Sequence, residues 1–134
     1  MKYLLDTNIV AYIINERPFE VLTKFQSLSK NEISISSIVV AELWFGVAKS
    51  HKKEQNKLAL ESFLAPLTII DFDSAAAKFY GLIRADLENK GVVIGSNDML
   101  LAAHAISLGL TLVTNNAREF ERVEGLKIEN WVLS

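Results

Sequence analysis

The sequence predicts an α/β domain in three layers, with a central parallel β-sheet flanked by helices. Short apolar runs suited to buried strands alternate with segments of helical periodicity along the whole chain. Residues that cap or stop helices stand at most of the transitions. Right-handed crossovers between the strands would place helices on both faces of the sheet. The chain has 134 residues, so we expect one domain over residues 1–134.

The first strand is expected to end in an acid. The apolar run Tyr3–Leu5 is followed directly by Asp6, and Thr7 and Asn8 offer N-cap chemistry for a helix over Ile9–Asn15. Asp6 would then lie at the carboxyl end of a buried parallel strand, where open α/β sheets bind their ligands. The alternative interpretation is that Asp6 only caps the following helix.

The middle of the chain is predicted to contain three helices and two strands. In order they are a helix from Pro18 to about Ser29, a strand Ile33–Ser36, a helix capped by Ser36 or Ser37, a helix Lys53–Leu64 and a strand Leu67–Ile70. Gly46 weakens the second of these helices without ending it, and Pro66 stops the third.

The remainder of the chain repeats the alternation. The expected elements are a helix opened by Asp73 or Ser74 and ended at Lys90-Gly91, a strand or loop Val92–Gly95, a helix Asn97–Leu108 capped by Ser96 and ended by Gly109, a strand Leu110–Thr114, a short helix near Arg118–Arg122 and a last strand Leu126–Glu129.

Composition excludes several classes of protein. The apolar runs are shorter than the ~18 to 20 residues of a membrane helix, and Asp6 interrupts the N-terminal run before it could act as a signal peptide. We therefore expect a soluble, cytoplasmic protein without a membrane partner. The absence of cysteine removes disulfides, thiolate nucleophiles and cysteine metal sites.

The charge balance argues against a protein that coats nucleic acid. The net charge is −2, whereas such proteins usually carry a basic excess. The concentrated basic stretch is Lys49–Lys53, followed by Lys57. We interpret it as a solvated helix end, with a guide for phosphate groups as the alternative.

Three acids lack a local basic partner. Glu42 has only Ile38, Val39, Phe45 and Gly46 one helical turn away, and Asp98 also has no base at these spacings. Together with Asp6 they lie on surfaces otherwise suited to a core, where burying an unpaired carboxylate is costly. Divalent cations could compensate this charge through oxygen ligands, as in a metal-dependent phosphodiesterase. For Asp98 alone, a favourable interaction with the helix dipole is the alternative.

Four short motifs follow one another along the chain. They are Leu5-Asp6-Thr7-Asn8, Ser37 with Ala41-Glu42-Leu43, Ile94-Gly95-Ser96-Asn97-Asp98 with Ala102-Ala103-His104-Ala105 behind it, and Leu112-Val113-Thr114-Asn115-Asn116 before Glu119-Phe120. In this order they resemble the PIN domain and, more narrowly, the VapC-type toxins of type II toxin–antitoxin modules. The resemblance extends from Lys2 to about Trp131.

The resemblance implies a set of site residues. Asp6, Glu42 and Asp98 match the three principal acids of the family, with Asp6 and Asp98 as direct ligands of Mg²⁺, for which Mn²⁺ could substitute. Glu42 would complete the ligand set or position the attacking water. The fourth acidic position of the family falls at Asn116, which gives a second metal ion less support than the first.

The same resemblance suggests a role for five further polar residues. The residues expected to surround and orient the acids are Thr7, Asn8, Ser37, Thr114 and Asn116. The alternative for these residues is a local role in a cap or turn. Arg118 is the suggested contact with an RNA phosphate.

The resemblance also implies an activity and partners. We expect hydrolysis of RNA phosphodiester bonds, with transfer RNA as a frequent substrate of such toxins, leaving a 5′-phosphate and a 3′-hydroxyl. A homodimer and a cognate VapB-type antitoxin that covers the site are further expectations. Exposed apolar residues would support that partner; Trp44 and Phe45 are candidates, unless they belong to the core.

Two rival functions remain. A phosphatase of the haloacid-dehalogenase type would need a second Asp two residues after Asp6, where this chain has Asn8. A catalytically silent module that binds RNA or protein is favoured only by Asn116 at the fourth acidic position. His104 is interpreted as a packed histidine rather than a ligand, and Arg84 as the partner of Glu88 in a surface ion pair.

Overall fold

A computed structural model describes residues 1–133, and Ser134, the last residue of the predicted domain, lies outside them. The described residues contain one five-stranded parallel sheet in the order β3-β2-β1-β4-β5. The strands are β1 (Tyr3–Leu5), β2 (Ile33–Ser36), β3 (Thr68–Ile70), β4 (Thr111–Val113) and β5 (Ile128–Glu129). The predicted parallel sheet is confirmed.

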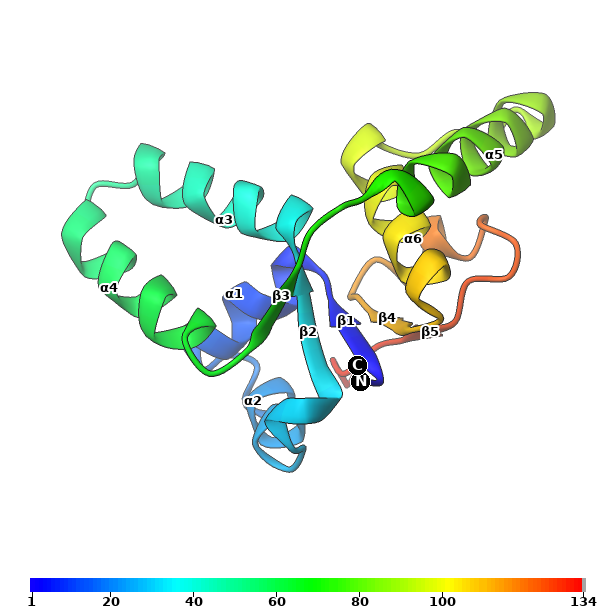
Figure 1. The fold of residues 1–134 in the computed structure, drawn as a ribbon. Helices are drawn as coiled ribbons and strands as arrows, with labels where there is room; N and C mark the ends of the chain where they lie inside the picture. The colour runs from blue at the N-terminus through cyan, green and yellow to red at the C-terminus, as the bar shows by residue number, and fades with distance from the viewer. Residues whose placement is uncertain (134) are drawn as a thin grey trace.

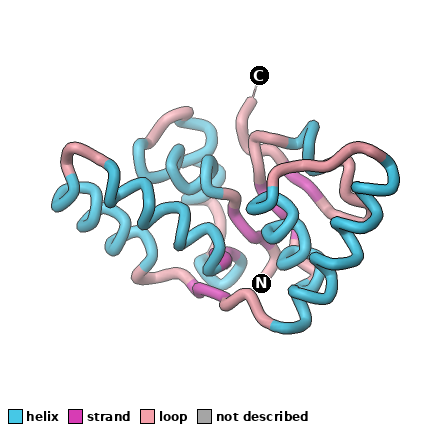
Figure 2. Tube along the Cα trace, turned by 90° about the horizontal axis from the view of Figure 1, so that it is seen from above, coloured by secondary structure: helices cyan, strands magenta, loops and turns pink. Residues whose placement is uncertain are grey.

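Helices cover the two faces of this sheet. They are α1 (Thr7–Asn15), α2 (Phe19–Gln26), the 3₁₀ helix η1 (Lys30–Glu32), α3 (Ser37–Lys49), α4 (Lys53–Leu64), α5 (Ser74–Lys90), α6 (Ser96–Leu108) and α7 (Ala117–Phe120). Figure 1 shows α1 to α4 on one side of the strands and α5 and α6 on the other, and Figure 2 shows the strands between the two groups of helices. The three-layer prediction is therefore confirmed.

The strand order creates a switch point between β1 and β4. The chain proceeds from β1 to β2 and β3 in one direction, then returns past β1 to form β4 and β5 on its other side. Leu5 pairs with Val113, so the residues that follow β1 and β4 leave the sheet side by side at its carboxyl edge. Ligands of open α/β sheets bind at such points.

The first helix begins earlier than predicted. Asp6 is the N-cap of α1, because its backbone is extended and its side chain accepts from the Thr7 N–H. The prediction that Thr7 and Asn8 supply the cap is wrong, since both are already helical. This capping role does not prevent Asp6 from serving in a site, so the two interpretations of Asp6 are compatible.

Two other helix ends differ from the prediction. Helix α2 ends at Gln26 rather than near Ser29, because the Ser27 hydroxyl donates to the Lys24 carbonyl and satisfies an exposed acceptor of the last turn. Ser96 is the first residue of α6 and not its cap, since Gly95 is the N-cap residue and makes no side-chain capping bond. By contrast, Ser36 and Asp73 cap α3 and α5 through their side chains.

The remaining boundaries agree closely with the prediction. Helix α3 continues through Gly46, and Gly91 and Gly109 end α5 and α6 in the left-handed conformation expected of glycine at a C-cap. Residues 92–95 form no regular element. No helix of the described residues is long and apolar enough to span a membrane.

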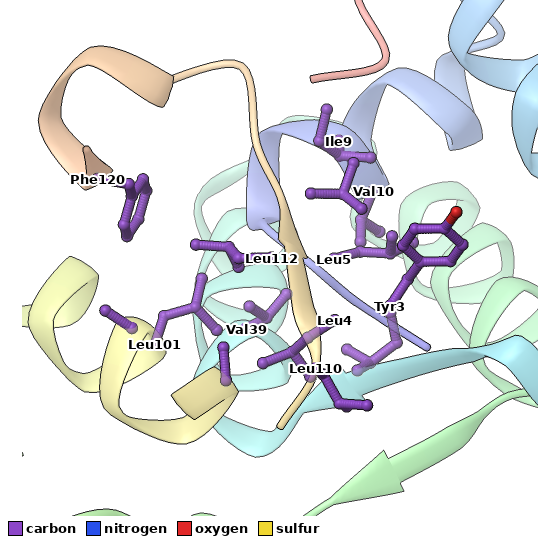
Figure 3. Close-up of a cluster of buried hydrophobic side chains, with 14 of the residues drawn as sticks. Tyr3, Leu4, Leu5, Ile9, Val10, Val39, Leu101, Leu110, Leu112 and Phe120 are labelled. Atoms are coloured by element: carbon purple, nitrogen blue, oxygen red, sulfur yellow. The ribbon is translucent and has the colours of Figure 1, made fainter. Parts of the chain in front are cut away.

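The core lies on β1 and β4. Leu4, Leu5 and Leu112 are completely buried, and Figure 3 shows them among side chains from α1, α3, α6 and α7. Burying one such side chain stabilises the fold by about 1.5–3 kcal/mol. This packing fixes the two central strands and the residues that leave their carboxyl ends.

Candidate active site

Asp6 is held rigidly at the end of β1. Its Oδ1 accepts from the Thr7 N–H at 2.7 Å, and its Oδ2 accepts from the Thr114 hydroxyl at 2.8 Å. Its own N–H donates to the Val113 carbonyl at 2.9 Å. Asp6 is 7% exposed and Thr114 is completely buried. Both carboxylate oxygens are therefore oriented by bonds from elements on either side of the switch point.

Burial raises the pKa of the Asp6 carboxyl above its ordinary value. The hydrogen bonds from Thr114 and Thr7 oppose this rise, because they favour the charged form. Within residues 1–133 the buried carboxylate thus receives two donors and forms no ion pair, a condition that favours a cation beside it.

Thr7 connects the first two predicted acids. Its N–H donates to Asp6, and its hydroxyl donates to Oε1 of Glu42 in the second turn of α3 at 3.2 Å. Burial raises the pKa of Glu42, the Thr7 hydrogen bond lowers it, and the charge of Asp6 raises it further. One threonine therefore fixes the relation between two carboxylates from different elements.

The surroundings of Glu42 differ from those inferred from its sequence neighbours. We expected a surface suited to a core, but Glu42 is only half-buried and Phe45, one turn on, is 65% exposed. Glu42 lies at the wall of an open groove instead. This expectation was wrong because the face of α3 that carries Glu42 and Phe45 lines a groove instead of packing into the core.

Asp98 is the most strongly perturbed acid of the site. It lies in the first turn of α6, and its pKa is raised to about 6. Burial is the largest cause, followed by the charges of Asp6, Glu119 and Glu42. A helix dipole acting alone would lower this pKa, so the raised value reflects burial and the neighbouring carboxylates.

Glu119 is a site residue that the sequence reasoning missed. It lies in α7, and its charge is the second largest carboxylate contribution to the raised pKa of Asp98, ahead of that of Glu42. The fourth acidic position was assigned to Asn116, three residues earlier. The signal for Glu119 in the sequence is an acid in the first turn of the short helix that follows the polar residues after β4.

The other predicted polar residues divide into two groups. Thr7 and Thr114 contact acids directly, and the Asn116 N–H donates to the Thr114 hydroxyl at 2.9 Å. The Ser37 hydroxyl instead accepts from the Phe72 N–H at 3.0 Å, and Asn8 is exposed.

Arg118 is exposed on α7. Its predicted contact with an RNA phosphate is not tested by the structure. The pairing of Arg84 with Glu88 is confirmed at 2.9 Å.

His104 is packed, as predicted, and links two helices of the site. It is 1% exposed, its Nδ1 lies 2.8 Å from the hydroxyl of Ser36, and its ring meets Phe72 edge-on. Ser36 caps α3, which carries Glu42, while His104 lies on α6, which carries Asp98. Burial lowers the pKa of His104, so the ring is neutral near pH 7.

The donor set fits a hard divalent cation. In residues 1–133 the ion pairs all involve α5, so no basic side chain neutralises the site acids. Within this range no group of three or more His, Asp or Glu side chains is placed to hold a metal ion by itself. Mg²⁺ does not require such a group, since it usually binds through one or two carboxylates and completes its shell with water and substrate phosphates.

Comparison with known proteins identifies the family. The model of the PIN domain matches residues 3–126 of the chain. This chain belongs to the PIN domain family. It is 52% identical to ribonuclease VapC2 of Rickettsia felis over 132 residues, covering 98% of both chains. It is 43% identical to the tRNA(fMet)-specific endonuclease VapC of Shigella flexneri over 131 residues, again covering 98% of both.

A solved structure supports the same assignment. This PIN domain superposes with a TM-score of 0.92 on a chain in the crystal structure of VapBC2 from Rickettsia felis bound to a DNA fragment from their promoter. The two sequences are 50% identical, and the match covers 98% of this chain and all of that one. Within the PIN family, the chain is therefore a member of the VapC group.

Proposed function

We propose that this PIN domain is a metal-dependent endoribonuclease and the toxin of a type II toxin–antitoxin pair. The observation that carries the proposal is a set of four acids, Asp6, Glu42, Asp98 and Glu119, at the carboxyl edge of the sheet. Burial, together with the charges of the other three acids, raises the pKa of Asp98 to about 6. Uncompensated carboxylates at a switch point are suited to binding a cation and, through it, a phosphate.

The site residues have distinct proposed roles. Asp6 and Asp98 hold Mg²⁺, with Mn²⁺ as a substitute, and Glu42 completes the ligand set or positions the attacking water. The bound ion would supply a Lewis acid for the phosphate and lower the pKa of a water molecule. Thr7 and Thr114 keep Asp6 in its orientation through the hydrogen bonds described above.

The proposed reaction is hydrolysis of an RNA phosphodiester. Water attacks the phosphorus, the bond to the 3′-oxygen breaks, and the products carry a 5′-phosphate and a 3′-hydroxyl. The pKa of Asp98, raised to about 6 chiefly by burial, gives the site a carboxylate that can exchange a proton near neutral pH.

Transfer RNA is the proposed substrate class. The name of the Shigella flexneri relative makes initiator transfer RNA the first substrate to test. The VapBC2 complex of Rickettsia felis supports a VapB-type antitoxin as the partner. We further propose a homodimer and a single folded domain over the whole chain.

The test is cleavage of a transfer RNA pool by the purified, antitoxin-free protein in Mg²⁺. Fragments with 5′-phosphates that disappear with a chelator and in Asp98→Asn would support the proposal. Asp86→Asn is the matched control, because Asp86 is an acid on α5 that pairs with Lys90 outside the site. If RNA is bound but stays intact in Mg²⁺ and Mn²⁺, the catalytically silent binding module replaces the enzyme.

A further inference from the structure

A groove leads away from the acids along the outer face of α3. Its volume is about 690 Å³. Three elements line it: α1 with Thr7 and Ala11, α3 with Glu42, Phe45 and Lys49, and α6 with Asn97. One end of the groove thus contains a proposed catalytic acid, while the other contains an aromatic ring and a cation.

Helical geometry places these three side chains of α3 in a row. Glu42, Phe45 and Lys49 are three and four residues apart, so they share one face of the helix. The row extends about 10 Å along the axis, at about 1.5 Å per residue. Phe45 is 65% exposed, and the Lys49 ammonium lies 5.0 Å from the centre of its ring.

The basic side chains continue beyond the groove. Lys52, Lys53 and Lys57 follow Lys49 around the turn into α4, and all four are exposed. None of them forms an ion pair within residues 1–133. Because the whole chain has a net charge of −2, attraction of a polyanion must come from a local patch such as this one.

We propose that this groove is a subsite for a single-stranded segment of RNA beside the scissile phosphate. A base stacks on Phe45, a neighbouring phosphate pairs with Lys49, and the three following lysines add longer-range attraction. The proposal rests on the proposed ribonuclease function, since Glu42 defines the end of the groove at which cleavage occurs. Exposed aromatic rings beside cations are the usual means of holding single strands without sequence preference.

The charge pattern favours RNA over a protein segment in this groove. An apolar peptide could cover Phe45, but it would gain nothing from the adjacent lysines. A nucleotide strand uses both features, because each unit has an aromatic face and a negative charge. Binding of a protein partner at Phe45 is one outcome of the test.

The experiment measures binding and cleavage separately. Binding of a fluorescently labelled single-stranded RNA oligonucleotide is followed by anisotropy with the full-length, antitoxin-free chain and chelator, so that no cleavage occurs. Phe45→Ala should weaken binding about 10-fold, and Phe45→Trp should preserve it. Lys49→Ala should reduce the slope of log Kd against log salt by about 0.7.

Matched controls lie on other surfaces of the molecule. Phe19 is 70% exposed at the start of α2, and Lys78 is exposed on α5. Phe19→Ala and Lys78→Ala should leave RNA binding unchanged. In Mg²⁺, Phe45→Ala should raise KM about 10-fold and leave kcat within about 2-fold, because Phe45 is proposed to bind RNA without touching the reacting atoms.

The possible failures can be told apart. If Phe45→Ala weakens RNA binding no more than Phe19→Ala does, the subsite proposal is overturned even when the parent protein cleaves RNA. The same holds if Phe45→Ala reduces antitoxin affinity alone. If RNA binding depends on Phe45 but the parent does not cleave in Mg²⁺ or Mn²⁺, the groove binds RNA through Phe45, but the proposed ribonuclease function fails and the groove has no scissile phosphate beside it.

Discussion

The end of β1 and the first turn of α6 place two acids with different neighbours in one site. Asp6 has a hydrogen bond to each carboxylate oxygen, from the Thr7 N–H and the Thr114 hydroxyl. Asp98 is affected chiefly by burial and by three negative neighbours, which raise its pKa to about 6. Burial disfavours the charged form of both acids, but the fold gives Asp6 two hydrogen-bond donors that oppose this effect, whereas the neighbours of Asp98 add negative charge to it. The site thus combines Asp6, whose orientation is fixed by hydrogen bonds, with Asp98, whose charge a bound cation would stabilise.

The largest effect is expected from removing the charge of Asp98. Asp98→Asn should lower RNA cleavage by more than about 100-fold, because even the hydrogen-bonded partners of metal ligands are worth 10–100-fold. Steady-state cleavage in Mg²⁺ measures this effect, with Asp86→Asn as the control. Activity within about 10-fold of the parent would remove Asp98 from the proposed ligand set.

The next effect tests how the fold positions Asp6. Thr114→Val keeps the shape of the side chain but removes the donor to Asp6 and the acceptor for the Asn116 N–H. We expect cleavage to fall about 10–100-fold and the free energy of unfolding to fall by about 1–3 kcal/mol. Thr111→Val in β4 is the matched control. Equal effects of the two substitutions would show that the Asp6 contact has no special role.

In the absence of metal, substitutions of Asp98 and Asp6 should change the melting temperature in opposite directions. Asp98→Asn relieves repulsion and should raise the melting temperature by about 3 °C at pH 7.5, after allowance for solvent screening. Asp6→Ala removes the partner of two donors and should lower it by several degrees. Thermal unfolding in chelator measures both. A lower melting temperature for Asp98→Asn would contradict the proposed electrostatic difference.

The smallest effect is the pH dependence of that stability. The folded state raises the pKa of Asp98 from about 3.8 to about 6, so between these values it binds more protons than the unfolded state. The free energy of unfolding without metal should therefore fall as pH rises through this window. The increase in the free energy of unfolding caused by Asp98→Asn should be near zero at pH 3.5 and complete above pH 7. Metal affinity should change in the opposite direction, rising with pH as Asp98 loses its proton.

The local elements could be predicted because their determinants lie within one helical turn or one strand. Ser36 and Asp73 cap helices through donors two or three residues away, and Gly91 and Gly109 end helices in the left-handed conformation. The errors arose where a nearby polar group competed. Asp6 rather than Thr7 capped α1, because the carboxylate reaches the adjacent N–H.

The relation between the acids could be predicted only in part. Motif order identified Asp6, Glu42 and Asp98, but Glu119 was missed because its importance depends on its proximity to Asp98 rather than on its own neighbours. The sequence also did not decide whether Phe45 is exposed, since an apolar residue on a helix fits either a core or a binding surface.

The sequence by itself determined the alternation of strands and helices, the acid after the first strand and the lack of local counter-charges, because these depend on residues close in the chain. The tertiary structure decided that Thr7 bridges Asp6 and Glu42, that Thr114 orients Asp6, and that Glu119 acts on Asp98. Hydrogen bonds and charge coupling depend on distance in space. The pairing of β1 with β2 brings Glu42 near Thr7, and the return of the chain past β1 to form β4 brings Thr114 and Glu119 to the same edge of the sheet.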